Sequence, residues 1–347
     1  MSIKDKCIKL DIINDARVIL LGIAAFLVVF FHTYNLNYLE LINVPILSNL
    51  MNFIQRIGNC GVDIFLFLSG IGLYISMSKN SVLKFYKNRF IKIIPKYLIV
   101  LIVYSFFVVE MDGVRIIETL FGLPFFLEGV RDGWYIAFIM LMYLIFPLIY
   151  KIIRKYDIYA LFVGLLMVVI LNLTLSMVFP VDYFKWEVAF SRIPIFLIGT
   201  FIGKKIYDGS KISIKTIRTC FVIQLVVLLL LYINVNLINF TIFARYLYCP
   251  LAISFVINIS WLYSLLKNKD NLWLKPIKFM GRHSLEMYLI NEKCSYIIRN
   301  IFLLTSYVEI YLLSFMLTLV FSFILSKMVD FVISRFSILF KNKKYVY

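Results

Sequence analysis

The sequence predicts an all-α membrane protein: a bundle of about ten transmembrane helices with the N- and C-termini in the cytoplasm. Hydrophobic residues make up 62% of the chain and charged residues 16%, whereas soluble proteins are about half hydrophobic and about 25% charged. The mean hydropathy of +0.92 agrees with a membrane protein. The third observation is the uneven distribution of Lys and Arg between the apolar segments. This composition excludes a water-soluble globule, a disordered chain and a small disulfide scaffold.

Ten apolar segments are long enough to cross a bilayer, for which a helix needs about 20 mostly apolar residues. They cover roughly 18–36, 60–77, 93–110, 133–150, 158–178, 187–204, 219–237, 244–266, 283–303 and 307–333. The connections are short, so we expect residues 1–347 to form a single integral-membrane domain. The first segment follows a charged start and ends without a small-residue cleavage site, so it is interpreted as a span rather than a signal peptide.

Lys and Arg collect on one side of these spans. With the N-terminus placed inside, 28 of the 36 Lys and Arg residues lie in cytoplasmic segments. The other eight are Arg56, Arg115, Arg131, Lys185, Arg192, Arg245, Lys293 and Arg299. Because cytoplasmic loops are enriched in Lys and Arg, this division predicts ten spans in a multi-pass protein of the cell membrane. The net charge of +17 is then explained by the membrane topology, and it favours contact with the anionic head groups of the lipid bilayer. Nucleic-acid binding is not expected.

Metal and disulfide chemistry have little support in the sequence. The five cysteines are scattered, no Cys-x-x-Cys pair occurs, and the chain has only two histidines. Neither a zinc site nor a disulfide framework is therefore expected.

Ionisable side chains inside spans are costly, and they persist where they are paired or line a wet cavity. Most of those in this chain fall at the outer ends of spans: His32, Asp63, Glu187, Arg192 and Arg245. Glu286 and Glu292 bracket the ninth span. A polar cavity that is reachable from the outer side is the simplest arrangement that accommodates them.

Arg17 and His32 lie on the same face of the first helix. Fifteen residues separate them, which corresponds to about 60° in projection and a rise of about 22 Å. Arg17 is at the cytoplasmic end and His32 is near the outer end. His32 is either an interface histidine with its ring at the head groups or a general base for a hydroxyl, because neutral imidazole accepts protons near pH 7.

Five segments, in order along the chain, resemble the integral-membrane acyltransferase 3 family. They are Gly61–Gly70 (GVDIFLFLSG), Phe85–Pro95 (FYKNRFIKIIP), Gly133–Ile136 (GWYI) with Tyr143 and Pro147, Arg192–Pro194 with Phe196–Gly199, and Gly281–Leu285 (GRHSL) with Tyr288–Ile290. The chain also departs from the family pattern at three places. Leu21 occupies the position of the first-span Arg, Arg89 and Lys92 replace paired arginines, and Asn291 stands where many relatives have His.

The resemblance implies a reaction. An acyl group, expected to be acetyl, would move from cytoplasmic acyl-CoA to a hydroxyl of a cell-surface polysaccharide or a lipid-linked sugar. Acyl-CoA would be a co-substrate, and no other cofactor is expected. The sequence contains no motif for a nucleophilic Ser or Cys, so direct transfer and an acyl-enzyme intermediate both remain open.

The expected site has two parts. His32 would be the catalytic base, and Asp63 would orient its ring, unless Asp63 serves as a helix N-cap. Arg89 and Lys92, with Arg17 on the same face, would bind the phosphates of acyl-CoA, unless this basic stretch only sets the topology.

The acceptor, or the cavity around it, would be lined by Trp134, Tyr135, Glu187 and Arg192. Alternatively, Trp134 and Tyr135 belong to an aromatic belt at the membrane interface, and Glu187 and Arg192 form an ion pair.

A transporter or exporter of a glycan or envelope precursor is the alternative function. Ten spans and a wet cavity would suit that function equally well. A transporter needs neither a base at His32 nor a phosphate site at the inner face, so these two features distinguish the hypotheses.

Overall fold

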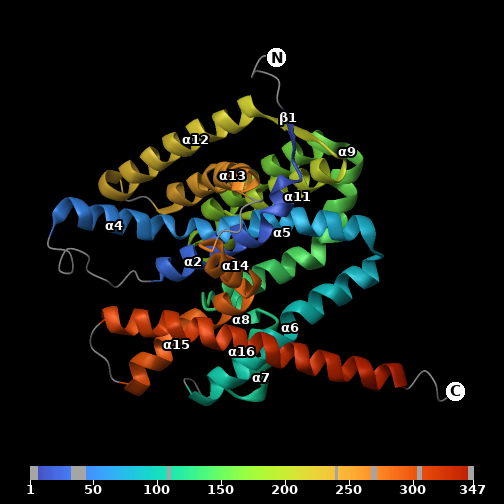
Figure 1. The fold of residues 1–347 in the computed structure, drawn as a ribbon, viewed down its shortest axis with the longest axis vertical. Helices are drawn as coiled ribbons and strands as arrows, with labels where there is room; N and C mark the ends of the chain where they lie inside the picture. Colours follow the sequence, from blue (N-terminus) through green and yellow to red (C-terminus); the bar gives the residue numbers. More distant parts are fainter. Residues whose placement is uncertain are drawn as a thin grey trace.

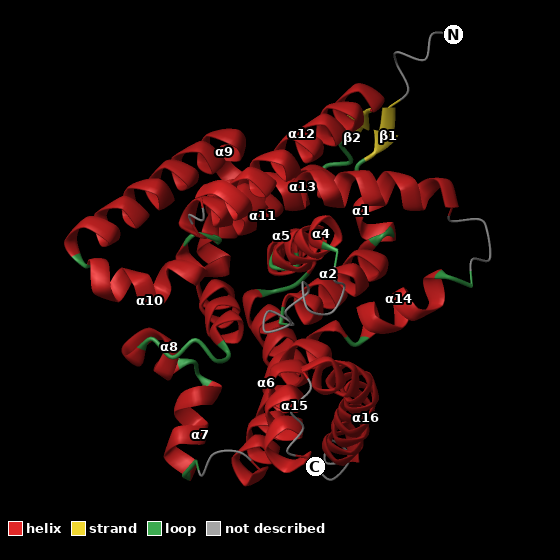
Figure 2. Ribbon diagram, turned by 90° about the vertical axis from the view of Figure 1, so that its left-hand side faces the viewer, coloured by secondary structure: helices red, strands yellow, loops and turns green. Residues whose placement is uncertain are grey.

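A computed structural model describes residues 7–32, 44–107, 111–238, 241–266, 272–302 and 307–342. This part of the chain is almost entirely helical, with two short strands at one edge (Figure 2). The prediction of an all-α fold is thereby confirmed, apart from the small sheet. The strands are β1 (Cys7–Lys9) and β2 (Lys211–Ser213), which pair antiparallel with Ile8 opposite Ile212.

The helices of the first half are α1 (Ile12–Asp15), α2 (Arg17–Phe31), α4 (Pro45–Ile57), α5 (Cys60–Lys79), α6 (Val82–Phe107), α7 (Gly113–Leu120), α8 (Leu123–Glu128) and α9 (Trp134–Val178). The helices of the second half are α10 (Pro180–Phe190), α11 (Ile193–Tyr207), α12 (Ile214–Ile233), α13 (Thr241–Leu266), α14 (Leu274–Arg282), α15 (Ser284–Phe302) and α16 (Tyr307–Asn342), with a π-helical turn, η2 (Asn234–Ile238), after α12.

Helices occupy all ten predicted segments, but several boundaries differ. The first helix ends at Phe31, and the remainder of segment 18–36 after His32 lies outside the described residues. The basic stretch before residue 93 is not a loop, because α6 already begins at Val82 and continues through Pro95. The segments 133–150 and 158–178 form one helix, α9, that is interrupted at Asp157.

The interruption at Asp157 bends the chain at that point. Its φ of 51° and ψ of −124° are not helical, and a positive φ is uncommon for a residue other than glycine. The carboxylate lies 2.9 Å from Nζ of Lys205 and 3.4 Å from Nζ of Lys204. These two ion pairs tie the bend of α9 to the end of α11.

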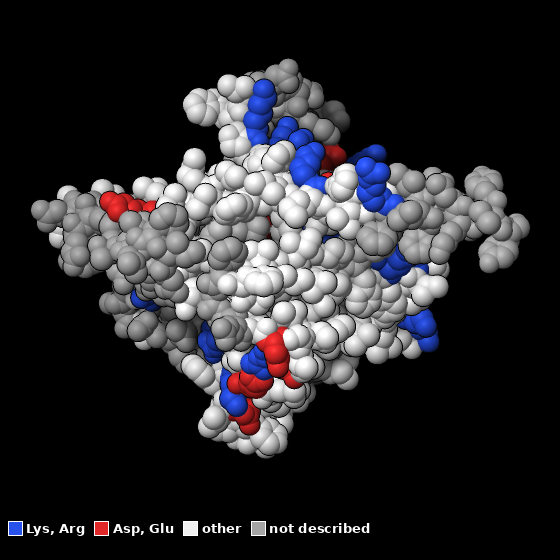
Figure 3. All heavy atoms as spheres, turned by 90° about the horizontal axis from the view of Figure 1, so that it is seen from below, with Lys and Arg blue, Asp and Glu red and all other residues white. Residues whose placement is uncertain are grey.

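Six helical stretches of the described chain are long and apolar enough to cross a membrane, and two of them join consecutive helices, α4 with α5 and α10 with α11. They are Pro45–Lys79, Trp134–Val178, Pro180–Tyr207, Ile214–Ile233, Ala244–Leu266 and Val308–Arg335, and Arg17–Phe31 is a shorter apolar helix. The surface agrees with a membrane protein: one face is a broad uncharged expanse with charged side chains toward its edges (Figure 3).

Helix α2 lies at the centre of the bundle and packs closely against α14 and α5. A methyl group on Gly22 would lie 2.0 Å from the carbonyl oxygen of Ile277, and one on Gly61 would lie 2.5 Å from that of Ala24. The absence of side chains at these glycines therefore lets the backbones touch. The long helices α5, α12 and α16 lie across the view in Figure 1, whereas α13 is seen along its length in Figure 2. We call the two ends of the bundle the Arg17 face and the His32 face, after the residues at the two ends of α2.

Candidate functional site

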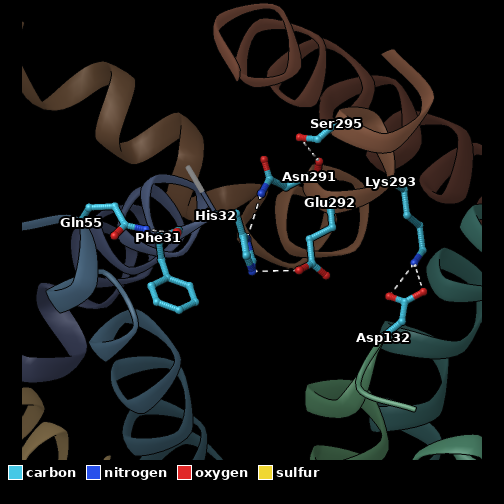
Figure 4. A network of polar contacts seen from close by, with 8 residues as sticks. All are labelled: Phe31, His32, Gln55, Asp132, Asn291, Glu292, Lys293 and Ser295. Atoms are coloured by element: carbon cyan, nitrogen blue, oxygen red, sulfur yellow. Dashed lines mark hydrogen bonds and ion pairs between the residues drawn. The ribbon is translucent and has the colours of Figure 1, made fainter. Parts of the chain in front are cut away.

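His32 lies immediately after α2, and both of its ring nitrogens have partners on α15. Nε2 is 3.0 Å from Oε1 of Glu292, and Nδ1 is 3.1 Å from the amide nitrogen of Asn291 (Figure 4). The His32 side chain is 19% exposed and that of Glu292 is 53% exposed. The ring is therefore held in place and still reachable.

These contacts define the tautomer of the neutral ring. The amide nitrogen of Asn291 is a donor, so Nδ1 accepts and the ring proton on Nε2 is donated to Glu292. A hydroxyl that replaces the Asn291 amide at Nδ1 could give up its proton there. The carboxylate on the opposite nitrogen would stabilise the imidazolium that forms.

A polar cavity of about 310 Å³ lies beside Glu292, the carboxylate partner of His32. Its lining residues are Tyr104, Arg131, Asp132, Glu292, Lys293 and Tyr296. Nζ of Lys293 lies 3.0 Å from both carboxylate oxygens of Asp132 and 4.5 Å from the centre of the Tyr104 ring. In Figure 4 this ion pair lies on the other side of Glu292 from His32. Charged groups and aromatic faces together suit a polar ligand with ring faces, such as a sugar.

A second polar cavity, of about 140 Å³, lies at the Arg17 face. Its lining includes four basic side chains, those of Arg17, Lys92, Lys96 and Arg282. Lys96 is paired with Glu286, and Nη1 of Arg17 donates to the carbonyl oxygen of Leu68 at 2.8 Å. More positive than negative groups line this cavity, so it suits an anion.

Arg89 lies beside this basic cavity and lines a larger, mostly apolar one. Its guanidinium carbon is 5.6 Å from the ring centre of Phe85 and 6.0 Å from that of Tyr143. Its Nε is buried and has no hydrogen-bond partner. Ile93 and Tyr143 line both cavities, so the two spaces adjoin.

Two tyrosines lie between the basic cavity and His32. The rings of Tyr135 and Tyr288 have centres 4.9 Å apart, and both residues line the basic cavity. Tyr288 precedes Asn291 and Glu292 on α15 by about one helical turn. Gly133, with a φ of 71°, begins α9 and so sets the position of Tyr135.

A sequence profile described as an acyltransferase domain, that of the acyltransferase 3 family, matches residues 19–327. The chain belongs to this family. The resemblance seen in the five motifs is thereby confirmed over nearly the whole chain. Neither the curated proteins nor the solved structures contain a significant match.

Two of the family motifs meet around the basic cavity and the apolar cavity beside it. The basic segment of α6 supplies Arg89 and Lys92, and the late motif supplies Arg282 and Tyr288. The predicted group of Arg17, Arg89 and Lys92 does lie at one face, but Arg89 lines a different cavity from the other two. Their role toward acyl-CoA remains a prediction.

The predicted contact between Asp63 and His32 is wrong. Oδ2 of Asp63 lies 3.2 Å from Nε of Arg192, and both side chains are 1% exposed. Arg192 also donates to Oδ1 of Asn59 at 2.9 Å and to the carbonyl oxygen of Val188 at 2.7 Å. The buried guanidinium needs the carboxylate as counter-charge, so Asp63 joins α5 to α11 and does not reach the imidazole.

The alternative ion pair between Glu187 and Arg192 is also absent. Oε1 of Glu187 lies 2.8 Å from Arg245 and 3.3 Å from Arg131. Trp134 covers Arg192, with its ring centre 5.1 Å from the guanidinium carbon. Trp134, Glu187 and Arg192 therefore belong to a buried network near the His32 face, whereas Tyr135 faces the basic cavity.

Sequence reasoning missed Glu292 and Asn291 as the partners of His32. Glu292 stands out as a carboxylate within a predicted span, which is the signal that could have suggested it. Asn291 stands out as a departure from the family pattern. Neither signal identifies His32 as the partner, because Asn291 and His32 are 259 positions apart in the sequence.

Proposed function

We propose that the protein is a membrane O-acyltransferase that moves an acyl group from acyl-CoA to a hydroxyl of a cell-surface polysaccharide or lipid-linked sugar. One observation carries the proposal: α2 has a basic cavity at its Arg17 end and an imidazole–carboxylate pair at its His32 end. Family membership supports acyl transfer. The basic cavity suits phosphates, and the polar cavity beside Glu292 suits a sugar.

We further propose ten membrane crossings with both termini and the Arg17 face in the cytoplasm. The two halves of α9 count as two crossings around Asp157. Helices α2, α6 and α15 add three to the apolar helices named above, although the last two carry charges that line the cavities. The enrichment of Lys and Arg in the segments at this face supports its assignment to the cytoplasm of a cell membrane.

The reaction follows from the two sites. The phosphates of acyl-CoA would bind at Arg17, Arg89 and Lys92, and the arm of the donor would carry the thioester past Tyr135 and Tyr288. The acceptor hydroxyl would transfer its proton to Nδ1 of His32 as its oxygen attacks the thioester carbonyl carbon. Collapse of the tetrahedral intermediate then breaks the carbon–sulfur bond, and the thiolate of CoA takes up a proton.

The test is release of free CoA from acyl-CoA by purified protein in lipid nanodiscs, with acetyl-CoA as the first donor. His32→Ala should lower the rate by about 10²–10⁴, the usual contribution of a general base. His283→Ala is the matched control, because this second histidine contacts Phe279 and Phe323 instead. Full activity of His32→Ala would refute the mechanism, and absence of any acyl-CoA consumption would favour the exporter hypothesis.

The donor site is tested separately by binding. The double variant Arg89→Gln/Lys92→Gln should weaken acyl-CoA binding by about 1.5–3 kcal/mol for each charged hydrogen bond lost. Lys84→Gln/Lys87→Gln on the same helix removes the same charge from exposed positions. Equal weakening by both double variants would show a general charge effect and no donor site.

A further inference from the structure

The apolar cavity next to Arg89 is larger than an acetyl donor requires. It has a volume of about 340 Å³ and lies between α6, α9 and the loop-linked helices α7 and α8. A cavity of roughly 150 Å³ is enough to hold benzene. Its apolar walls include Ile94 of α6, Phe126 of α8 and Met140 and Leu141 of α9.

The shape of this cavity is that of a groove along the helices. On α6 the lining runs from Tyr86 to Ile94, which corresponds to a length of about 12 Å. Phe90 and Leu144 on its rim are 50% and 65% exposed. The groove is therefore open on one side, where these exposed apolar side chains form its rim.

Among the residues that line the groove, Arg89 is the charged one, and its buried Nε lacks a hydrogen-bond partner. The groove adjoins the basic cavity of Arg17 and Lys92 through the shared residues Ile93 and Tyr143. A ligand that fills both spaces must combine anionic groups with a hydrocarbon chain, and an acyl-CoA with a chain longer than acetyl has this composition.

We propose that the groove between α6 and α9 binds the hydrocarbon chain of the acyl donor, and that the preferred donor is a medium-chain acyl-CoA. This inference rests on the proposed function, in which the phosphates of acyl-CoA bind at the Arg17 face and the thioester lies near His32. The chain would enter the groove at Ala137, which also lines a cavity with Tyr104 and Asp132, two residues of the polar cavity beside Glu292. Each methylene buried in the groove leaves water and adds to the affinity. Chains much longer than the groove must leave it through the side opening and gain no further contacts with its walls.

The experiment measures competition between unlabelled acyl-CoAs and radiolabelled acetyl-CoA on full-length protein in nanodiscs. Octanoyl-CoA should bind at least ten-fold more tightly than acetyl-CoA, and palmitoyl-CoA should gain little over octanoyl-CoA. Leu141→Trp, which fills the groove, should shift the preference toward acetyl-CoA by five-fold or more. Leu141→Ala, which enlarges the groove, should shift the preference toward octanoyl-CoA. This variant also tests the inference if Leu141→Trp fails to fold.

Leu148→Trp is the matched control, because Leu148 lies on the same helix and is 63% exposed outside the groove. Equal affinity for acetyl-CoA and octanoyl-CoA would overturn the inference and leave the proposed function standing. A preference for octanoyl-CoA that neither Leu141 variant changes would also overturn it, and would assign the groove to a bilayer lipid. Failure of every acyl-CoA to compete, together with no release of CoA, would refute the proposed function itself.

Discussion

Asp63 and Arg192 form an ion pair that is fully enclosed by the helix bundle. Each side chain is 1% exposed, and Arg192 in addition donates hydrogen bonds to Asn59 and to the carbonyl oxygen of Val188. Removal of the Asp63 carboxylate would leave a buried guanidinium with two neutral acceptors and no adjacent counter-charge. We therefore predict that Asp63 acts on stability and not on the chemical step.

The magnitude follows from the burial. Loss of one partner of a buried ion pair typically costs about 3–5 kcal/mol. At about 2 °C per kcal/mol for a large chain, Asp63→Ala should lower the Tm by about 6–10 °C. The double variant Asp63→Ala/Arg192→Met should be less destabilised than the sum of its parts, by about 0.5–3 kcal/mol, because it removes both charges together.

The assay is thermal unfolding in detergent, with activity of the folded fraction measured in parallel. Asp182→Ala is the control: it breaks the exposed pair with Lys185, and such surface pairs contribute about 0–1 kcal/mol. If Asp63→Ala keeps its Tm but loses CoA release, the structural role is refuted. Asp63 would then have to act in catalysis, through a conformation that brings it to His32.

Three further predictions concern other parts of the molecule. Glu292→Gln should lower the rate of transfer by up to about 10²-fold with unchanged acyl-CoA binding, because glutamine cannot stabilise an imidazolium at His32, and full activity would remove Glu292 from the mechanism. Gly22→Ala should cost about 1–3 kcal/mol, measured by thermal unfolding, because its methyl group would overlap the carbonyl oxygen of Ile277; a stable variant would contradict the close crossing. A cysteine at Lys87 should react with a membrane-impermeant reagent only in inverted vesicles, and labelling in intact cells would reverse the proposed topology.

The two polar sites illustrate what helical periodicity can predict. The sequence predicts that Arg17 and His32 lie at opposite ends of one helix, because rise and rotation per residue are fixed. The charge of the basic stretch of α6 likewise predicts its position on the Arg17 side. The predicted contact between Asp63 and His32 rests only on their common membrane level, and this criterion does not distinguish between the helices that share that level.

The sequence by itself determined the all-α membrane class, most of the helical segments, the family and the identity of the candidate base. These properties depend on composition, local periodicity and short motifs, which can be read along the chain. The tertiary structure decided which side chains meet: His32 with Glu292 and Asn291, Asp63 with Arg192, and Arg89 with an apolar groove. The physical reason is that periodicity fixes the face on which a side chain lies, whereas its partner depends on which distant helix packs against that face.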